Sequence, residues 1–449
     1  MSRSLLARDR SADDPPGPDE LPGVGSTVGF VRDPFAFMTR MAREYGPVVS
    51  YDVGGRTFYQ LNDPVDIEDV LVQRNELFVK GELFQTMLNR VVGKGLLTSE
   101  GEFWRRQRHL VQPTFTPDRL AAYGEVMTDA TAATMAEWSD GERRDVHADM
   151  SELTLSIVAS ALFGVDMRDR TSVVGDALDV VMARSEGVLL DVLPEWTPTP
   201  GNRRYDRAVA ALDAVVDDIV AARRRNPGDD LVSALLTAED ETGRGMDLEQ
   251  LRDEVKTLLL AGHETTALSL SFTLFVLAQR PDVERRLLDE LETVLDGRTP
   301  TVADLDDLEY TEKVVTESMR LYPPVYGMLR EPTEPVAFGG YTVPEGGTIS
   351  VNQWVVHRDP QWYDDPMAFR PERWTPGMRD DLPRFAYFPF SGGPRRCIGD
   401  RFAMQEAQLV LASLYQNYHF ELVSPPSMEL AAAITTRPTK PIEAVVHER

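Results

Sequence analysis

The stretch FSGGPRRCIG, residues 390–399, holds the only cysteine of the 449-residue chain. Three glycines surround Cys397, and glycine permits backbone conformations and close approaches that a side chain would block. A lone cysteine is most often a small buried hydrophobe without chemistry. Here Arg395 and Arg396 precede it and favour the thiolate over the thiol. The sequence therefore predicts a loop that presents a soft ligand to something large and flat.

A cysteine thiolate is one of the axial ligands that proteins use to hold haem iron. The stretch resembles the haem-binding loop of the cytochromes P450, Phe-x-x-Gly-x-Arg-x-Cys-x-Gly. The matching residues are Phe390, Gly393, Arg395, Cys397 and Gly399. The resemblance implies that Cys397 is the axial ligand of haem b, iron protoporphyrin IX, and that Arg395 contacts a haem propionate.

The length alone is compatible with two to four domains, but no linker or internal repeat divides the chain. We expect residues 1–20 to be disordered and residues 21–449 to form a single haem domain. No apolar run reaches the ~18 residues of a membrane span. The polar N-terminus lacks the apolar core of a signal peptide, which favours a cytoplasmic protein without a membrane anchor. A single cysteine excludes an internal disulfide.

The chain is strongly acidic, with 47 Lys and Arg against 73 Asp and Glu and a net charge of −26. This sign argues against a general nucleic-acid-binding protein. The lysines are few, namely Lys80, Lys94, Lys256, Lys313 and Lys440. Dense carboxylate with little lysine suits a cytoplasm rich in salt, where charge repulsion is screened. We expect a halophilic archaeon as the source, with an acidic protein of a GC-rich genome as the alternative.

Hydrophobic periodicity predicts a mainly α-helical fold with small β-sheets near each end. Residues 48–61 form an expected hairpin with Gly54 and Gly55 at its turn. Helical patterns cover residues 117–138, 150–163, 202–225, 248–279, 311–321 and 401–415. Short strands are expected within residues 336–352, whereas residues 360–390 show little regular period. This agrees with the P450 fold, which the family resemblance implies and periodicity alone does not supply.

The long predicted helix contains Ala-Gly-His-Glu-Thr-Thr at residues 261–266. The Thr265 hydroxyl can compete for the carbonyl of Ala261, four residues earlier, and loosen the helix. The alternative is an ordinary buried helix with a polar spot. The segment resembles the P450 oxygen-activation motif, Ala/Gly-Gly-x-Asp/Glu-Thr. By this resemblance Thr265 and Glu264 are catalytic, with Glu264 as the acid that relays protons, and Ala261 adjoins the haem.

Glu317 and Arg320 lie three residues apart, on one face of a predicted helix. Such pairs are common and carry no message alone. With the segment Phe-Arg-Pro-Glu-Arg-Trp at residues 369–374, they resemble the P450 Glu-x-x-Arg motif and its arginine partner. The resemblance implies a buried triad of Glu317, Arg320 and Arg373 that locks the loop carrying Cys397.

Haem propionates need donors of arginine type. The segment Trp-Arg-Arg-Gln-Arg at residues 104–108 resembles the family's Trp-x-x-x-Arg. The resemblance implies that Trp104 and Arg108 contact the propionates, with Arg105 and Arg330 as further candidates. For Arg106, a solvated basic patch is the alternative.

Arg105, Arg106, Arg396 and Arg401 gather in sequence around two of these motifs, which suits docking of an acidic electron donor. We expect a separate ferredoxin-type donor with its reductase, because the chain has no nucleotide-binding fingerprint and no iron–sulfur cysteine set. The family pattern also places aliphatic residues in a distal pocket, which favours a small hydrophobic substrate. These are Leu97, Val325, Met328 and Ile434. Ordinary core positions explain them equally well.

Together the motifs imply a haem-thiolate monooxygenase that inserts one oxygen atom from O2 into a hydrophobic substrate. A haem-thiolate peroxygenase or isomerase and a non-catalytic haem-binding protein remain alternatives. A cysteine hydrolase is disfavoured because no partner histidine and aspartate are evident. Fatty acids, carotenoids, other isoprenoids and steroids all stay open as substrates, and so does the oligomeric state.

Overall fold

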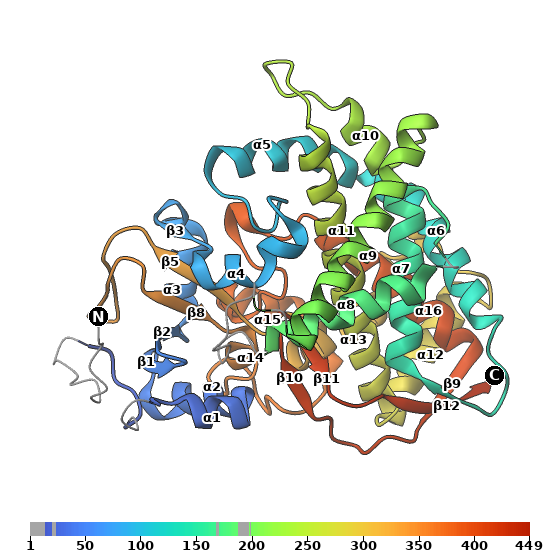
Figure 1. Cartoon of the computed structure of the whole chain (residues 1–449). Helices are drawn as coiled ribbons and strands as arrows, with labels where there is room; N and C mark the ends of the chain where they lie inside the picture. Colours follow the sequence, from blue (N-terminus) through green and yellow to red (C-terminus); the bar gives the residue numbers. More distant parts are fainter. Residues whose placement is uncertain (1–13, 20–23, 168–169, 187–196, 198) are drawn as a thin grey trace.

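A five-stranded sheet and a large group of helices occupy opposite sides of the molecule (Figure 1). The computed structural model describes residues 14–19, 24–167, 170–186, 197 and 199–449. The predicted hairpin is confirmed as β1 (Val48–Val53) and β2 (Arg56–Leu61), with left-handed glycines at its turn. The sheet order is β1-β2-β8-β5-β3, and only β2 and β8 pair in parallel. The remaining strands are β3 (Phe78–Val79), β5 (Met328–Pro332) and β8 (Thr348–Val351).

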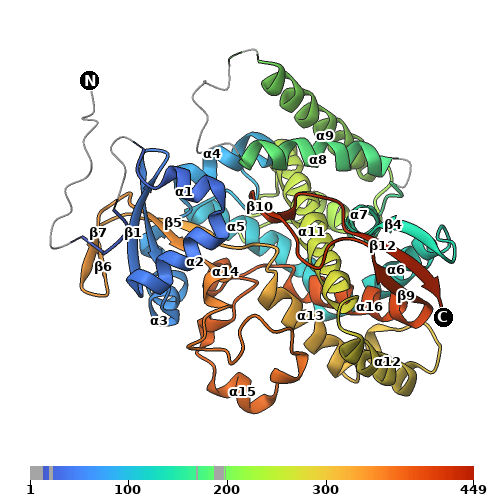
Figure 2. The same cartoon turned by 90° about the horizontal axis from the view of Figure 1, so that it is seen from below.

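Three smaller sheets complete the β structure of the described residues. One has three strands in the order β4-β12-β9. These are β4 (Glu142–Asp145), β12 (Glu443–Glu448) and β9 (Tyr418–Leu422). The two hairpins are β6 (Val336–Phe338) with β7 (Tyr341–Val343), and β10 (Leu430–Ala432) with β11 (Thr436–Pro438). Figure 2 shows β10 beside the long helix α11 (Leu248–Leu277).

Helix α11 forms the centre of the helical part. It is long and apolar enough to cross a membrane, but 83% of its most apolar window is buried inside the protein. Such a helix is apolar nearly all round because other helices surround it. It packs against α7 (Val146–Phe163), α13 (Glu309–Leu321) and α16 (Asp400–Asn417). This arrangement brings the residue 261–266 segment into the interior.

The other helices mostly agree with the predicted ranges. They are α1 (Thr27–Arg32), α2 (Pro34–Tyr45), α3 (Pro64–Glu68), α4 (Gly81–Val92), α5 (Gly101–Val111), α6 (Pro117–Met135), α8 (Thr171–Glu186), α9 (Pro200–Arg225), α10 (Leu231–Thr237), α12 (Pro281–Leu295), α14 (Gln353–Val356) and α15 (Pro376–Asp381). Helix α7 starts before the predicted residue 150. Its N-cap is Asp145, whose side chain accepts the backbone N–H groups of His147 and Ala148.

Residues 14–19, within the segment expected to be disordered, are described and contact β1. The backbone N–H of Ser50 donates to the carbonyl of Pro16 at 2.9 Å, and its hydroxyl donates to the carbonyl of Pro15 at 2.9 Å. The carbonyls of Pro15 and Pro16 are free to accept hydrogen bonds, and Ser50 on the edge strand β1 supplies the donors. Residues 1–13 and 20 lie outside the described residues.

Candidate active site

The loop that carries Cys397 has its path fixed by glycine. Gly393 has φ +64°, and a Cβ atom there would lie 1.9 Å from the carbonyl oxygen of Leu71. A Cβ atom at Gly392 would lie 2.4 Å from the ring of Phe385. Both approaches exclude a side chain, because real Cβ atoms do not come so close. The backbone N–H of Cys397 then donates to the carbonyl of Phe390 at 3.0 Å, which closes the loop.

The side chain of Cys397 is exposed. Many protein atoms nevertheless surround the thiol, and this burial raises its pKa. The backbone N–H of Gly399 lowers the pKa, and Arg108 and Arg396 act in the same direction, but burial is the larger cause. Arg396 therefore favours the thiolate as expected, but burial outweighs it in the protein alone, and Arg395 is not among the causes of the shift. A bound metal ion deprotonates a coordinating thiol outright, so the iron itself can supply this effect.

Helix α5 lies against this loop and provides two of the predicted propionate contacts. The guanidinium of Arg395 lies 3.9 Å from the ring centroid of buried Trp104, a cation–π contact. Arg395 also donates to the carbonyl of Ser99 at 2.8 Å and pairs with Glu100. Arg108 donates to the carbonyl of Arg396 at 2.9 Å. The structure thus brings Trp104, Arg108, Arg395 and the cysteine loop together.

Arg105 lies at the exposed edge of this group, close enough for its charge to help lower the pKa of Arg395, for which burial is the larger cause. It follows Trp104 by one residue, which turns it about 100° around the helix axis. Its side chain is 60% exposed and pairs with Glu102. The contact of Arg105 with a propionate stays a prediction, which its exposure and its pair with Glu102 disfavour.

Arg105 and Arg108, both on α5, should therefore differ in their effect on cofactor binding. We expect Arg108→Ala to yield protein with a clearly lower haem-to-protein ratio, because a desolvated donor is lost. Arg105→Ala is the matched control, and we expect it to bind haem like the parent protein. Absorbance of the purified proteins measures both ratios. Equal losses in the two variants would contradict the assignment.

Arg106 is also occupied within the protein. Its Nε atom lies 2.5 Å from a carboxylate oxygen of Asp240, and its side chain is only 19% exposed. Its remaining N–H groups donate to the carbonyls of Arg244 and Gly245. Arg106 thus anchors the loop between α10 and α11, and it is not a free member of a basic patch.

Lys80 joins the cationic group, and the sequence analysis missed it. Burial lowers the pKa of Lys80 to about 7, and Arg395 and Arg330 act in the same direction. Burial also lowers the pKa of Arg330 to about 10, again helped by Arg395. Glu100 is the carboxylate that opposes both shifts most strongly. A lysine within the apolar run FVKGELF, residues 78–84, was the available signal.

These residues fit a haem group. One buried lysine and several partly buried arginines share few carboxylates, which suits the two negative propionates of the cofactor. Across the fold, Ala261, Gly262 and Thr265 are partly exposed on α11 while the residues between them are buried. Small side chains on one face of a buried helix leave room for a flat group.

The local helix geometry around Thr265 agrees with the sequence analysis. Its hydroxyl donates to the carbonyl of Ala261 at 2.8 Å. Gly262 lies where α7 and α11 meet. A Cβ atom there would lie 3.2 Å from the side chain of Val158, so this glycine lets α7 pack closely on α11. The glycine therefore serves helix packing at least on that side.

The proposed substrate contacts come from separate segments, and each is partly exposed. Leu97 precedes α5, Val325 follows α13, Met328 begins β5 and Ile434 lies between β10 and β11. Leu97 and Ile434 pack against the helical core, whereas Met328 packs against the core beneath the five-stranded sheet. Their contact with a substrate stays a prediction.

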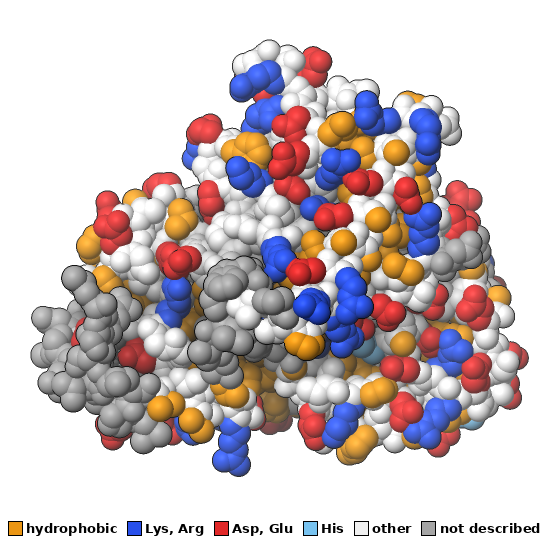
Figure 3. All heavy atoms as spheres, in the orientation of Figure 1, with side chains coloured by type: hydrophobic (Ala, Val, Ile, Leu, Met, Phe, Trp, Pro, Cys, Tyr) orange, Lys and Arg blue, Asp and Glu red, His pale blue; other side chains and the backbone are white. Residues whose placement is uncertain are grey.

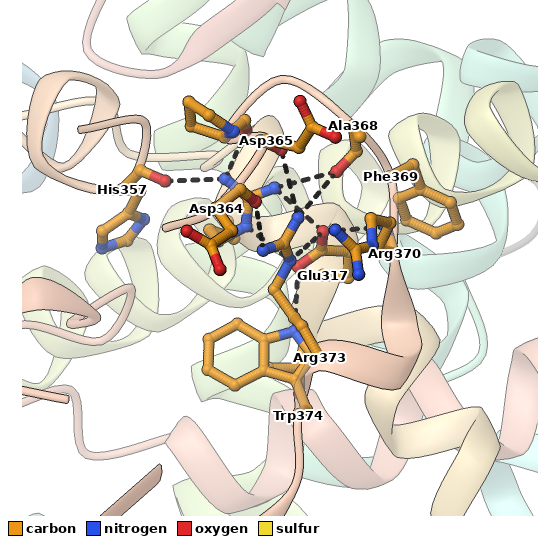
Figure 4. A network of polar contacts seen from close by, with 12 residues as sticks. Glu317, His357, Asp364, Asp365, Ala368, Phe369, Arg370, Arg373 and Trp374 are labelled. Carbon is orange, nitrogen blue, oxygen red and sulfur yellow. Dashed lines mark hydrogen bonds and ion pairs between the residues drawn. The ribbon is translucent and has the colours of Figure 1, made fainter. Parts of the chain in front are cut away.

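A buried carboxylate organises the irregular segment that leads to the cysteine loop (Figure 4). The two oxygens of Glu317 each lie 2.9 Å from a guanidinium nitrogen of Arg320, and Arg373 adds a third contact at 2.9 Å. All three side chains are almost fully buried. The indole N–H of Trp374 also donates to Glu317 at 2.9 Å, a member that the motif comparison did not supply.

The other N–H groups of the two arginines donate to backbone carbonyls. Arg320 and Arg373 donate to the carbonyls of His357, Asp364, Asp365, Pro366 and Ala368. The ring of His357 accepts the backbone N–H of Phe388 at 3.0 Å, so this histidine supports the same segment. These side-chain hydrogen bonds hold the segment in place of the regular backbone hydrogen bonds of a helix or a sheet.

Comparison with known proteins agrees with this site. The cytochrome P450 family model matches residues 15–445. The chain is 36% identical to a cyclooctat-9-en-7-ol 5-monooxygenase of Streptomyces melanosporofaciens over 414 residues, which cover 90% of this chain and 89% of the relative. It is 33% identical to a pentalenene oxygenase of Streptomyces avermitilis over 405 residues, covering 89% and 90%.

A solved structure gives the same answer for the fold. The retinoic acid bound cyanobacterial CYP120A1 superimposes with a TM-score of 0.86 at 26% identity, covering 98% of this chain and 100% of that one. The fold class predicted from the sequence is thus confirmed. The chain belongs to the cytochrome P450 family, as a monooxygenase that binds haem b.

Proposed function

We propose that this P450 hydroxylates a hydrophobic substrate of isoprenoid type and receives its electrons from a separate ferredoxin-type donor. The observation that carries the reaction is the accessible Cys397 thiol combined with Glu264 and Thr265 on the central helix. The substrate class is supported by the relatives, whose names denote pentalenene, a cyclooctatenol and retinoic acid. Aliphatic side chains at Leu97, Val325 and Ile434 agree with such a substrate.

Bound haem supplies the redox chemistry that activates dioxygen. Cys397 would hold its iron, and Trp104, Arg108, Arg330, Arg395 and Lys80 would hold its propionates. Thr265, on α11, would face the haem, and Glu264 beside it would supply protons to its hydroxyl. The surrounding apolar residues exclude water, which limits side reactions of the activated oxygen.

A panel of ligands tests the substrate class. We expect cyclic terpenes and retinoids to shift the Soret band of the ferric protein toward the high-spin position, whereas fatty acids and steroids of similar size do not. A hydroxylated product should then form with a ferredoxin, its reductase and NAD(P)H, at the expense of molecular oxygen. Product formation from hydrogen peroxide alone, without these partners, would favour the peroxygenase alternative.

We infer a docking surface for this donor from three exposed arginines, of which Arg105 and Arg396 also pair with Glu102 and Asp400. Arg105, Arg396 and Arg401 are exposed on α5, the cysteine loop and the first turn of α16. Acidic and basic side chains intermingle on the face of the protein that Figure 3 shows. A group of exposed arginines is distinctive on so acidic a chain. An acidic ferredoxin would be attracted to it.

Charge reversal tests this surface. We expect Arg105→Glu combined with Arg401→Glu to slow reduction by ferredoxin by about tenfold at low salt, with a smaller effect at high salt. Arg43→Glu, an exposed position on α2, is the control and should leave the rate unchanged. Stopped-flow reduction in the presence of carbon monoxide measures the rate. An unchanged rate in the double variant would exclude this docking surface.

We also propose that the protein works in a salt-rich cytoplasm. The proposal rests on the net charge of −26 and on the small number of lysines. Unfolding measured from dilute buffer to multimolar salt should show stability rising with salt, because screening reduces repulsion among carboxylates. Full stability in dilute buffer would contradict a halophilic origin.

A further inference from the structure

The segment of residues 93–98, which leads from α4 to α5 (Figure 1), lies directly on α11. A Cβ atom at Gly95 would lie 1.9 Å from Oγ1 of Thr257 and 2.7 Å from the carbonyl oxygen of Asp253. A Cβ atom at Gly93 would lie 2.1 Å from Oδ2 of Asp253. Real Cβ atoms do not come so close, so both positions need glycine. The backbone of the segment therefore touches the first half of the central helix.

Two neighbouring carboxylates of α11 hold this segment by its backbone. Oδ2 of Asp253 accepts the N–H of Lys94 at 2.8 Å, and Oε2 of Glu254 accepts the N–H of Leu96 at 3.0 Å. Glu254 is fully buried, and this burial raises its pKa to about 7, whereas the hydrogen bond from Leu96 lowers the pKa. Its other oxygen, Oε1, has no hydrogen-bond partner among the described residues. The hydrogen bond to Leu96 is therefore the contact by which this buried group acts on the segment.

Other elements hold the carbonyls of the same segment. Nζ of Lys80 donates to the carbonyl of Leu96 at 3.2 Å and also to that of Leu97. Gln107 of α5 donates to the carbonyl of Lys94 at 2.6 Å. Buried side chains thus hold both polar groups of the Leu96 backbone. The side chain of Leu97, next in the chain, leaves a main chain that is fixed on each side of the preceding peptide unit.

Spacing along α11 brings this segment close to the side of the helix where we place the haem. Thr257 follows Glu254 by three residues and Ala261 follows Thr257 by four, so the three lie on one helix face. Ala261 is partly exposed and lies about 6 Å along the axis from Thr257. Leu97 is also partly exposed and packs against the helical core. One face of α11 therefore carries both the anchor of the segment and the small residue beside the cofactor.

We propose that Glu254 is a positioning residue for substrate recognition: by holding the backbone of Leu96, it fixes Leu97 in the substrate pocket. The proposal rests on the substrate contact of Leu97 in the proposed function. A side chain that is already fixed loses no freedom when a ligand binds, so the affinity for a ligand that contacts Leu97 depends on this anchor. The ligand that a fixed aliphatic side chain selects is hydrophobic and is chosen by its shape.

The first test uses azoles as probes of the pocket in the holoprotein, because an azole nitrogen binds ferric haem iron without being oxidised. Phenylimidazole brings an apolar ring into the pocket, whereas imidazole needs little more than access to the iron. We expect Glu254→Leu to weaken binding of phenylimidazole about tenfold and to leave binding of imidazole unchanged. Glu254→Gln keeps an acceptor for the N–H of Leu96 and should bind both azoles like the parent protein. Titration of the Soret band measures the affinities.

Two outcomes of this titration would overturn the proposal. One is parent-like binding of phenylimidazole by Glu254→Leu, and the other is an equal loss for both azoles, which would indicate damage to the haem site. Glu249→Leu is the matched control, because Glu249 is exposed on the first turn of the same helix. It should change neither affinity, and a loss for phenylimidazole in this control would also count against a specific role of Glu254.

Hydrogen–deuterium exchange gives a readout that includes the unsubstituted protein. The N–H of Leu96 should exchange slowly in the parent protein, because it is bonded to a buried carboxylate. Exchange within residues 93–98 should be faster in Glu254→Leu and parent-like in Glu254→Gln. Rapid exchange of Leu96 in the parent protein would refute the anchor, even where Glu254→Leu does not fold.

A double-variant cycle tests whether Glu254 acts through Leu97. Leu97→Ala should weaken binding of phenylimidazole, and in this background Glu254→Leu should add nothing further. Additive losses, or no loss in Leu97→Ala alone, would overturn the link between the two residues. The azoles report binding only, so a failure to hydroxylate terpenes would contradict the proposed function and leave this result unchanged.

Discussion

Replacing Cys397 with serine should abolish the absorption band of the reduced carbon monoxide complex that gives the family its name. Serine keeps the size and the backbone of the loop but offers no thiolate to the iron. Because the chain has no second cysteine, no other thiolate can take its place. We expect monooxygenase activity to fall by orders of magnitude, since the thiolate tunes the iron for oxygen chemistry.

The measurement is a carbon monoxide difference spectrum of the reduced variant after haem reconstitution. Gly393→Ala serves as a comparison, because it keeps the thiol but presses a methyl group on the carbonyl of Leu71. We expect that variant to bind less haem while the bound fraction keeps the parent band. A parent-like band in Cys397→Ser would refute Cys397 as the ligand.

Replacing Glu317 with alanine has the second large expected effect, and it should yield protein without haem. The substitution leaves Arg320 and Arg373 buried without a countercharge, and breaking a buried pair costs roughly 3–5 kcal/mol. It also removes the acceptor of the Trp374 indole and of the Arg370 backbone N–H. The segment before the cysteine loop would then lose its anchor.

Glu312→Ala provides the matched control on the same helix. Glu312 pairs with Arg379, and both side chains are more than 40% exposed. An exposed pair contributes about 0–1 kcal/mol, so this variant should fold and bind haem normally. Haem content and thermal unfolding of the two variants give the comparison. Holo protein with a normal Soret band in Glu317→Ala would refute the locking role.

Local signals predicted much of the fold. The alternating strands and the paired glycines marked the first hairpin, and apolar periodicity marked the long helices. Such features depend on neighbours in sequence, and the structure confirms them at β1, β2, α9 and α11. The start of α7 was missed, although Asp145 offered an N-cap signal.

The errors at the site come from contacts between distant segments. Arg106 was expected on an exposed patch, but Asp240 lies far from it in sequence and was not a foreseeable partner. The pKa of Cys397 depends on how much protein surrounds it, and sequence neighbours do not report that. Arg105 is different, since its turn away from the helix face of Trp104 follows from helix geometry alone.

The Glu317 network determines which substitutions the chain can accept in the segment that it holds. Its two arginines contact the segment from residue 357 to residue 368 through carbonyl oxygens, which every amino acid provides. The network therefore depends on the path of the main chain and not on the identity of the side chains along it. Substitutions that preserve this course should be tolerated, and the surface of the segment is free to adapt to new surroundings while the cofactor site stays unchanged.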